Sequence, residues 1–302
     1  MSLEQLATVR QLLAGLVTQE PRPLEESRAS YDGAGLAFGM PDGVTASKVN
    51  AGGVPAEWIA PSSGADAGVL LYIHGGGFAL GSLDSHRNLA ANIALAWKGR
   101  VLVVDYRRAP EHPFPAALDD TLSAYRWLLE TGNDPKSLAV AGDSAGGGLT
   151  VSTLVAARDA GLALPAAAVC ISPWANLENK GPSYAAQADA DPMVRHADLE
   201  RWAEAYLGDK TQRNAPLASP VHAELKGLPP FLIQTGGAEI LLADSQLLAE
   251  RLRTAGVSVD LDVWPDMIHV WHWFAPILSE GQAAINKLAR FVRTKVRSSG
   301  PD

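Results

Sequence analysis

A serine stands between two glycines in the stretch GDSAG at residues 142–146, after the apolar run 138–142 and before a helical pattern over 145–160. A turn this tight between a strand and a helix has no space for bulky side chains two residues before and after the serine. It exposes the serine hydroxyl at the end of the strand. The amide of Ala145 then lies at a helix N-terminus and points to the same place. We predict that Ser144 is a nucleophile rather than part of an ordinary glycine-rich turn.

A serine hydroxyl becomes a strong nucleophile only when a base takes its proton, and histidine is the commonest base. His269 follows the last predicted strand and Pro265, in a loop that can reach back over the sheet, so we predict that it is the base. His272, three residues later, is expected to pack structurally in a following helix. His196 and His222 are expected to be surface residues. The histidines downstream of the serine are His196, His222, His269 and His272.

The acid of such a triad is expected between the nucleophile and the base along the chain. Glu239 lies in the loop after the apolar run 231–235, so we predict that it accepts a hydrogen bond from His269. Asp244 competes for this role, but it falls where the next helical pattern begins, and there an aspartate is a typical N-cap. Three further aspartates precede the base too closely for this chain order: Asp260, Asp262 and Asp266.

The stretch HGGG at residues 74–77 follows another apolar run, 69–73. It forms either a plain turn or a loop whose bare N–H groups face a ligand. Acyl transfer develops an oxyanion that preorganised N–H donors stabilise, and glycines let the backbone approach it without Cβ atoms. A nucleophilic serine favours the second interpretation. We predict oxyanion-hole donors at Gly76, Gly77 and Ala145, and supporting roles for His74, Gly75 and Asp143.

Short apolar runs alternate with helical patterns from residue 69 onwards, and these elements must position the stretches above. Strands buried on both faces that alternate with helices indicate an α/β fold with a mostly parallel sheet flanked by helices. In the last run apolar and polar residues alternate, which is typical of an edge strand. Predicted strands are 69–73, 101–105, 138–142, 167–171, 231–235 and 257–264, and predicted helices are 85–97, 116–130, 145–160, 243–255 and 282–297.

The interval between the runs 167–171 and 231–235 spans about sixty residues, far more than one crossover needs. It contains a strong helical pattern over 198–207, which we interpret as part of an inserted lid that packs with an N-terminal helix. That first helix begins with a capping box, SLEQ at residues 2–5. Residues 20–68 are rich in proline and glycine, and we expect short strands and turns there.

Composition and charge narrow the classes of function. The 302 residues are 47% hydrophobic and 19% charged, as in a globular protein, and the formal net charge of −8 argues against nucleic acid as a partner. Cys170, the only cysteine, lies in an apolar run and is expected to be an inert buried thiol. The sequence lacks a run of the roughly 18 apolar residues that a membrane span needs, and it lacks a signal-peptide pattern. We therefore expect a cytoplasmic protein without stable membrane insertion.

Four motifs together resemble those of one family, in the family's order, and the resemblance covers residues 69 to 295. The chain is similar to the bacterial hormone-sensitive-lipase-like carboxylesterases. This implies the α/β-hydrolase fold and a serine carboxylesterase that hydrolyses short- to medium-chain esters through an acyl-enzyme. It also implies a small-molecule ester as the partner, no cofactor or metal, and frequent homodimerisation through an edge strand. The motifs are HGGGFALGS (74–82), DYRRAPEHPFPAALDD (105–120), GDSAGGGLT (142–150) and LPPFLIQTGGAEILLADS (228–245).

The resemblance also divides the chain into a helical cap, 1–45 and 176–212, and a catalytic domain, 46–175 and 213–302. The sequence departs from the family at two places. Most members carry aspartate as the acid where this chain has Glu239, and the usual leucine is replaced by Arg108. Three residues near that arginine are expected to support the oxyanion loop or the following helix: Arg107, Glu111 and His112.

Two other functions stay open on the sequence. An amidase or peptidase of the same fold would use the same residues, although the missing large substrate-gating domain argues mildly against peptides. A non-catalytic small-molecule binding protein, like the plant hormone receptors that resemble this family, should lack part of the triad. Ser144, Glu239 and His269 are all present, which favours an enzyme.

Overall fold

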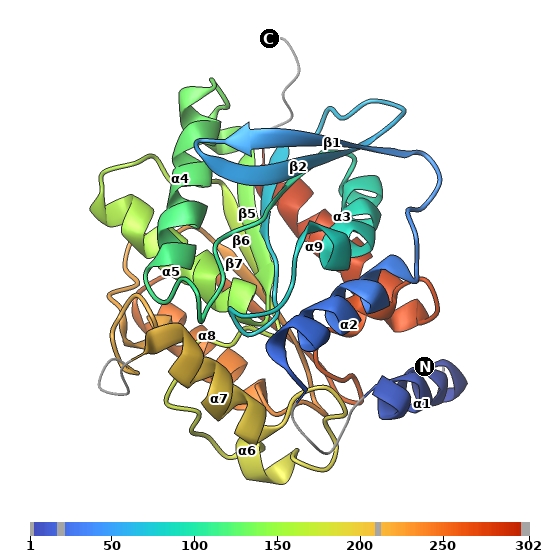
Figure 1. The fold of residues 1–302 in the computed structure, drawn as a ribbon. Helices are drawn as coiled ribbons and strands as arrows, with labels where there is room; N and C mark the ends of the chain where they lie inside the picture. Colours follow the sequence, from blue (N-terminus) through green and yellow to red (C-terminus); the bar gives the residue numbers. More distant parts are fainter. Residues whose placement is uncertain (1–2, 17–21, 209–212, 297–302) are drawn as a thin grey trace.

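An eight-stranded sheet forms the centre of the molecule, and the computed structural model describes residues 3–16, 22–208 and 213–296 (Figure 1). The strand order is β1-β2-β4-β3-β5-β6-β7-β8. Strands β3 to β8 pair in parallel, whereas β1 and β2 are antiparallel to their neighbours. The predicted α/β fold with a mostly parallel sheet is therefore confirmed. The strands are β1 (Val44–Ala51), β2 (Val54–Pro61), β3 (Val69–Ile73), β4 (Arg100–Val104), β5 (Leu138–Asp143), β6 (Ala167–Ile171), β7 (Phe231–Gly236) and β8 (Val259–Trp264).

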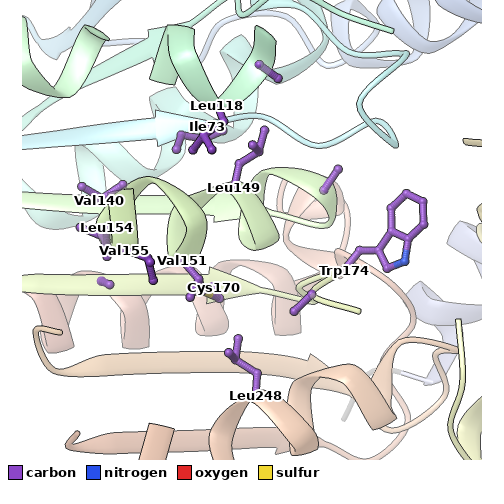
Figure 2. Close-up of a cluster of buried hydrophobic side chains, with 14 of the residues drawn as sticks. Ile73, Leu118, Val140, Leu149, Val151, Leu154, Val155, Cys170, Trp174 and Leu248 are labelled. Carbon is purple, nitrogen blue, oxygen red and sulfur yellow. The ribbon is translucent and has the colours of Figure 1, made fainter. Parts of the chain in front are cut away.

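Helices cover both faces of the sheet, which is why the central strands read as continuous apolar runs. Leu71 and Ile73 of β3 pack on the side of α4, α5 and α8, and Leu70 and Tyr72 pack on the side of α3 and α9. Figure 2 shows the first of these faces, where Ile73 lies near Leu118 of α4 and Leu149 of α5 in a cluster that also contains Leu248 of α8. The helices are α1 (Leu3–Leu16), α2 (Leu24–Leu36), α3 (Leu83–Trp97), α4 (Ala116–Glu130), α5 (Ala145–Asp159), α6 (Ser183–Ala186), α7 (His196–Leu207), α8 (Leu242–Thr254) and α9 (Ser279–Lys295).

The elements predicted from residue 69 onwards lie where they were expected, within a few residues at each end. Strand β8 is one edge of the sheet, as its alternating pattern predicted, and β1 is the other. Cys170 of β6 is fully buried, and burial raises the pKa of its thiol well above the usual range, as an inert thiol requires. No helix in the described ranges combines the length and the apolar character needed to cross a bilayer.

The expectation of short strands and turns over 20–68 is wrong in part, because Leu24–Leu36 forms the helix α2. Strands β1 and β2 follow it as expected. Helix α2 contains Gly33 and Gly35, both poor helix formers. A Cβ atom at Gly35 would lie 2.3 Å from the carbonyl oxygen of Ser85, so this glycine allows α2 to approach α3 closely. The predicted capping box at the start of α1 includes Ser2, which lies outside the described residues.

Helices α1, α2, α6 and α7 gather at one end of the sheet (Figure 1), the end at which the parallel strands deliver their loops. Arg28 of α2 donates hydrogen bonds to the carbonyl oxygens of Ala79 and Ala109 and pairs with Glu111 at 2.7 Å. These contacts connect the helix to the loop after β3 and to the loop after β4. The cap boundaries predicted from the sequence, 1–45 and 176–212, stay predictions.

Candidate active site

Ser144 occupies a strained turn between β5 and α5. Its φ of 53° and ψ of −121° are rare for a residue with a side chain, and the surrounding backbone is packed too closely for Cβ atoms. A Cβ at Gly142 would lie 2.3 Å from the Gly146 carbonyl oxygen, and one at Gly146 would lie 2.0 Å from the Ile73 carbonyl oxygen. The two glycines are therefore required by contact between β5, α5 and β3, and Ser144 is placed at the end of its strand.

The glycine loop after β3 lies beside this turn. Gly76 has φ +110° and Gly77 has φ +61°, and a Cβ at Gly76 would lie 2.5 Å from the backbone of Leu80. In the part of the chain that the structure describes, no acceptor takes a hydrogen bond from the amides of Gly76 and Gly77. The amide of Ala145 is the first of α5 and has no acceptor within the helix. The three predicted donors are thus available to an anion.

Asp143, one of the predicted supporting residues, connects the two loops. Its buried carboxylate accepts hydrogen bonds from the Gly75 amide at 3.1 Å and the Tyr72 hydroxyl at 2.8 Å. His86 of α3 places its Nε2 3.3 Å from the other carboxylate oxygen. Burial alone would raise the pKa of Asp143, but His86 and Tyr72 lower it more, so the pKa is depressed and the group is ionised.

His74 supports the same loop as an uncharged ring. Its ring stacks on Tyr106 with ring centroids 4.2 Å apart, and its Nδ1 lies 2.8 Å from the carbonyl oxygen of Gly75. Burial, followed by the neighbouring His86, lowers the pKa of His74 to about 3, so the ring stays neutral. Arg108 also holds this loop, because its guanidinium donates to the Gly81 carbonyl oxygen at 2.6 Å.

Glu239 and His269 face each other beneath the pocket. Oε1 of Glu239 lies 3.6 Å from Nδ1 of His269, and both atoms are buried without another hydrogen-bond partner. Burial lowers the pKa of His269, but Glu239 and then Asp191 raise it by more, so the net shift is upward. The separation is longer than a normal hydrogen bond, although apo sites often tighten only around substrate. The acid predicted from the sequence is thus the carboxylate that points at the predicted base.

Ser172, at the carboxyl end of β6, connects the acid to the base and was missed in the sequence. Its hydroxyl donates to Oε2 of Glu239 at 2.7 Å and accepts the amide of Val270 at 3.1 Å. The Gly236 amide donates to the same carboxylate oxygen at 2.9 Å. The position of Ser172 directly after a buried parallel strand was the available signal, because site residues gather at the carboxyl ends of such strands. His86 offered none, since it lies within the helix α3.

The predicted N-cap role of Asp244 is wrong. Helix α8 begins after Leu241 without a side-chain cap, and Asp244 is buried inside its first turn. Its carboxylate accepts the amides of Ala175 and Asn176 and the hydroxyl of Tyr184. Burial raises its pKa to about 7 despite these bonds. Asp244 therefore holds the loop after β6 instead of a helix end, and it does not contact the base.

The remaining predicted residues lie away from the base position. His272 is buried in the 3-10 turn Trp271–Phe274, with Nε2 3.0 Å from Oε1 of Gln234, so it packs structurally as expected. His196 and His222 lie near the surface beside glutamates. Arg107 binds Asp120 of α4, which supports the helix after the loop. Among the described residues, no group of three or more histidine, cysteine or acidic side chains could hold a metal ion.

A cavity of about 270 Å³ contains both Ser144 and His269 in its wall. Gly76 and Gly77 line it as well, so nucleophile, base and N–H donors open into the same space. This arrangement is suited to attack on a carbonyl carbon, with donors ready for the oxygen that becomes negative. Apolar side chains from the N-terminal helices, from the segment around α7 and from the 3-10 turn Trp271–Phe274 complete the wall, among them Leu13, Tyr31, Met193, Leu199, Trp202 and Trp273.

Comparisons with known proteins agree with this chemistry. A family model described as the alpha/beta hydrolase fold matches residues 70–273. An acetyl-hydrolase of Streptomyces hygroscopicus is 46% identical over 97% of this chain and 98% of its own length. The crystal structure of an esterase from the bacterial hormone-sensitive lipase family has a TM-score of 0.95 at 44% identity, covering 98% of this chain and 100% of that one. The structure of EstE5 soaked with p-nitrophenyl butyrate has a TM-score of 0.92 at 41% identity, covering 96% and 98%.

Proposed function

Because the chain belongs to the bacterial hormone-sensitive lipase family of α/β-hydrolases and is a carboxylesterase, we propose that Ser144, His269 and Glu239 hydrolyse its ester through an acyl-enzyme. One observation carries this proposal. Ser144 and His269 line the same cavity as two glycines whose amides have no acceptor in the described part of the chain. That geometry supplies a nucleophile, a base and an oxyanion site around a single carbonyl group.

In the first half of the reaction, Oγ of Ser144 attacks the ester carbonyl carbon while Nε2 of His269 takes the hydroxyl proton. The carbonyl oxygen becomes negative, and the amides of Gly76, Gly77 and Ala145 donate to it. When the tetrahedral intermediate collapses, the bond to the alcohol oxygen breaks and His269 returns its proton to that oxygen. The acyl group is then esterified to Ser144 and the alcohol is free to leave.

In the second half, His269 takes a proton from water, and the resulting hydroxide attacks the acyl carbon. Collapse returns the proton to Oγ of Ser144 and releases the carboxylic acid. Glu239 faces Nδ1 of His269 throughout, so it fixes the tautomer and stabilises the imidazolium that forms in each half. Ser172 and the Gly236 amide hold the other oxygen of Glu239, which keeps Oε1 aimed at the base.

The cavity favours small acyl groups. At about 270 Å³ it is enclosed by side chains of α1, α2 and α7, and cap residues such as Trp202 limit its depth. The relatives agree with this size, since one is named an acetyl-hydrolase and another was soaked with a butyrate ester. We infer that the physiological ester has a short to medium acyl chain. A cytoplasmic location and a homodimer through the edge strand β8 belong to the same proposal, as does the absence of nucleic acid among the partners.

The two competing functions receive less support. A non-catalytic binding protein should lack part of the triad, whereas here Ser144 and His269 line one cavity and Glu239 lies 3.6 Å from His269. An amidase would use the same groups, and no feature of the cavity favours an amide over an ester.

The test is hydrolysis of p-nitrophenyl acetate and butyrate, each beside its matched anilide, by the wild type and by Ser144→Ala. We expect ester turnover well above anilide turnover, and a loss of about 10⁴-fold or more in kcat for the variant. Phenylmethylsulfonyl fluoride should add one sulfonyl group to the wild type, located on Ser144 by mass spectrometry. Unchanged turnover in folded Ser144→Ala would refute the assignment, and faster anilide turnover would favour an amidase.

A further inference from the structure

The charge of the cavity wall differs in sign from the charge of the whole protein. Among the described residues, three arginines line the cavity, Arg22, Arg195 and Arg201, against one carboxylate, Asp198. The chain as a whole carries a formal net charge of −8. A positive wall in an acidic protein is not explained by hydrolysis of a neutral ester, because neither the nucleophile, the base nor the oxyanion donors depend on it.

Asp198 does not neutralise both Arg22 and Arg201. Asp198 lies 2.8 Å from Arg195 and 3.1 Å from Arg201, so it is shared between two guanidinium groups. Arg22 has no carboxylate partner within the described residues, and its Nη1 donates to the neutral Ser30 hydroxyl at 3.2 Å. Arg22 therefore carries a positive charge that no described carboxylate pairs with, and Arg201 shares Asp198 with Arg195.

Arg201 also has an unused donor close to the reaction centre. Its Nε is buried and has no hydrogen-bond partner among the described residues, although a buried donor normally has one. Its guanidinium lies 4.4 Å from the ring centroid of Trp202. That ring packs against Gly77, where a Cβ atom would lie only 2.9 Å from Trp202 Cδ1. One aromatic ring therefore separates Arg201 from a predicted oxyanion donor.

From these contacts we propose that the cavity contains a subsite for a carboxylate on the substrate, formed by Arg22 and Arg201. The substrate class is an ester that carries a second, ionised carboxyl group away from the ester bond. This rests on the proposed function, since it specifies which esters the same site takes. Arg22 precedes α2 and Arg201 belongs to α7, so the subsite joins the two cap segments over the nucleophile. Guanidinium donors match carboxylate geometry, and the excess charge attracts the anion.

The experiment compares each acidic ester with its near-isosteric neutral amide. On the alcohol side the pair is 4-acetoxyphenylacetic acid and 4-acetoxyphenylacetamide, and on the acyl side it is mono-p-nitrophenyl adipate and p-nitrophenyl adipamate. The readout is the acid-to-amide ratio of kcat/KM near neutral pH, which cancels general losses of activity. The variants are Arg22→Gln, Arg201→Gln and Arg201→Lys, with Arg126→Gln on the exposed face of α4 as the matched control.

We expect at least one pair to show the effect. Its ratio should fall about fivefold to tenfold in Arg22→Gln and in Arg201→Gln, as for a lost charge near the surface. Arg201→Lys should retain most of the ratio because the charge remains, and Arg126→Gln should leave it unchanged. Raising the salt concentration from about 0.02 M to about 0.5 M should also lower the acid-to-amide ratio of the wild type, because salt screens the charge. This measurement tests the subsite without a substitution.

The opposite results are equally clear. Ratios that stay constant in both glutamine variants and at high salt, for both pairs, would overturn the carboxylate subsite while leaving the esterase mechanism intact. Unchanged turnover in Ser144→Ala would instead overturn the proposed mechanism, and the ratios would still be measurable on the same substrates.

Discussion

The amide of Gly75 donates to the carboxylate of Asp143 across 3.1 Å, so the residue before Ser144 holds the loop that carries the oxyanion donors. Ser144 and the proposed donors Gly76 and Gly77 come from chain segments about seventy residues apart, and catalysis requires them to agree in position within fractions of an ångström. This one buried hydrogen bond, with the partners Tyr72 and His86 around it, fixes their relative position.

Asp143→Asn should therefore impair catalysis as well as stability. The asparagine oxygen can still accept from Gly75 and Tyr72, but the charge is lost and an NH₂ group replaces the oxygen that faces Nε2 of His86. We expect a loss of about 10- to 100-fold in kcat from misplaced donors and about 1–3 kcal/mol in unfolding free energy. Steady-state kinetics on p-nitrophenyl acetate and urea unfolding measure the two effects. Asp42→Asn, at an exposed turn, is the matched control and should change neither. Wild-type kcat in folded Asp143→Asn would show that the position of the loop does not depend on the charge of Asp143 or on its contact with His86.

His269→Ala should remove nearly all ester hydrolysis, about 10⁴- to 10⁶-fold in kcat, because nucleophile and base act as a unit. His272→Ala should keep most of the turnover, since that ring contacts Gln234 and lies outside the cavity wall. Circular dichroism on both variants separates lost chemistry from lost folding. If His272→Ala proves to be the inactive protein and His269→Ala the active one, the base has been assigned to the wrong histidine.

The pH dependence follows from the raised pKa of His269. Burial opposes that shift, but Glu239 more than compensates, and only the neutral ring can accept the serine proton. The acidic limb of kcat/KM should therefore lie above the ordinary histidine pKa of about 6.5. Glu239→Gln should move the limb to lower pH. A wild-type limb well below the ordinary value, with the fold intact, would contradict the pairing.

The raised pKa of His269 also affects folding stability, but its contribution to stability falls as the pH rises, whereas activity rises. A histidine whose pKa is raised in the folded state stabilises the fold fully below its unfolded pKa, and that contribution is lost as the pH rises through the folded pKa. For His269 this window begins near the ordinary histidine pKa and extends above it. Denaturant unfolding of wild type and His269→Gln across this window should show a stability difference that shrinks toward alkaline pH.

Glu239 and Asp244 should respond differently to loss of charge. Glu239→Gln should lower kcat by up to about 10⁴-fold, as when a triad acid is neutralised, and Glu239→Asp by about 10²-fold through shortened reach. Asp244→Asn should keep most of the turnover, because its oxygen can still accept from Ala175 and Asn176 while its nitrogen faces Tyr184. Asp244→Ala should instead cost about 2–5 kcal/mol of stability by leaving those groups unpaired. A crippled Asp244→Asn beside a nearly normal Glu239→Gln would require the two roles to be exchanged.

Substrate length should be limited by the cap. A cavity of about 270 Å³ should favour p-nitrophenyl esters of about two to eight acyl carbons over longer ones. Trp202→Ala should shift the optimum toward longer chains, since this ring narrows the cavity beside Gly77. A series of esters of increasing chain length gives the measurement. Faster hydrolysis of emulsified long-chain triglycerides than of soluble butyrate esters would point to a true lipase.

The sequence predicts most of the central fold because buried parallel strands are apolar throughout and the chemistry follows their carboxyl ends. Ser144, Glu239 and His269 follow β5, β7 and β8 in turn, so the strand pattern alone brings them to one edge. The glycines around Ser144 were also predictive, because they lie between an apolar strand and a helical pattern, where a tight turn has no space for larger side chains.

Other features depend on contacts between distant segments, and local patterns do not encode them. Helix α2 was missed because Gly35 weakens its helical signal, yet that glycine exists to let α3 approach. Asp244 resembled an N-cap by position, whereas its partners lie about seventy residues earlier in the chain. His86 and Ser172 act through single atoms that meet their partners only after folding. Neither residue belongs to a sequence motif that predicts its role.

The contacts of Arg28 bear on protein engineering. This side chain of α2 holds both the loop after β3 and the loop after β4, through Ala79, Ala109 and Glu111. Grafting the N-terminal helices of another enzyme to broaden the range of substrates would therefore also remove a support of the catalytic loops. A transplanted cap therefore needs an arginine at this position. Without it, the chimaera accepts larger substrates but loses the alignment of the loops after β3 and β4.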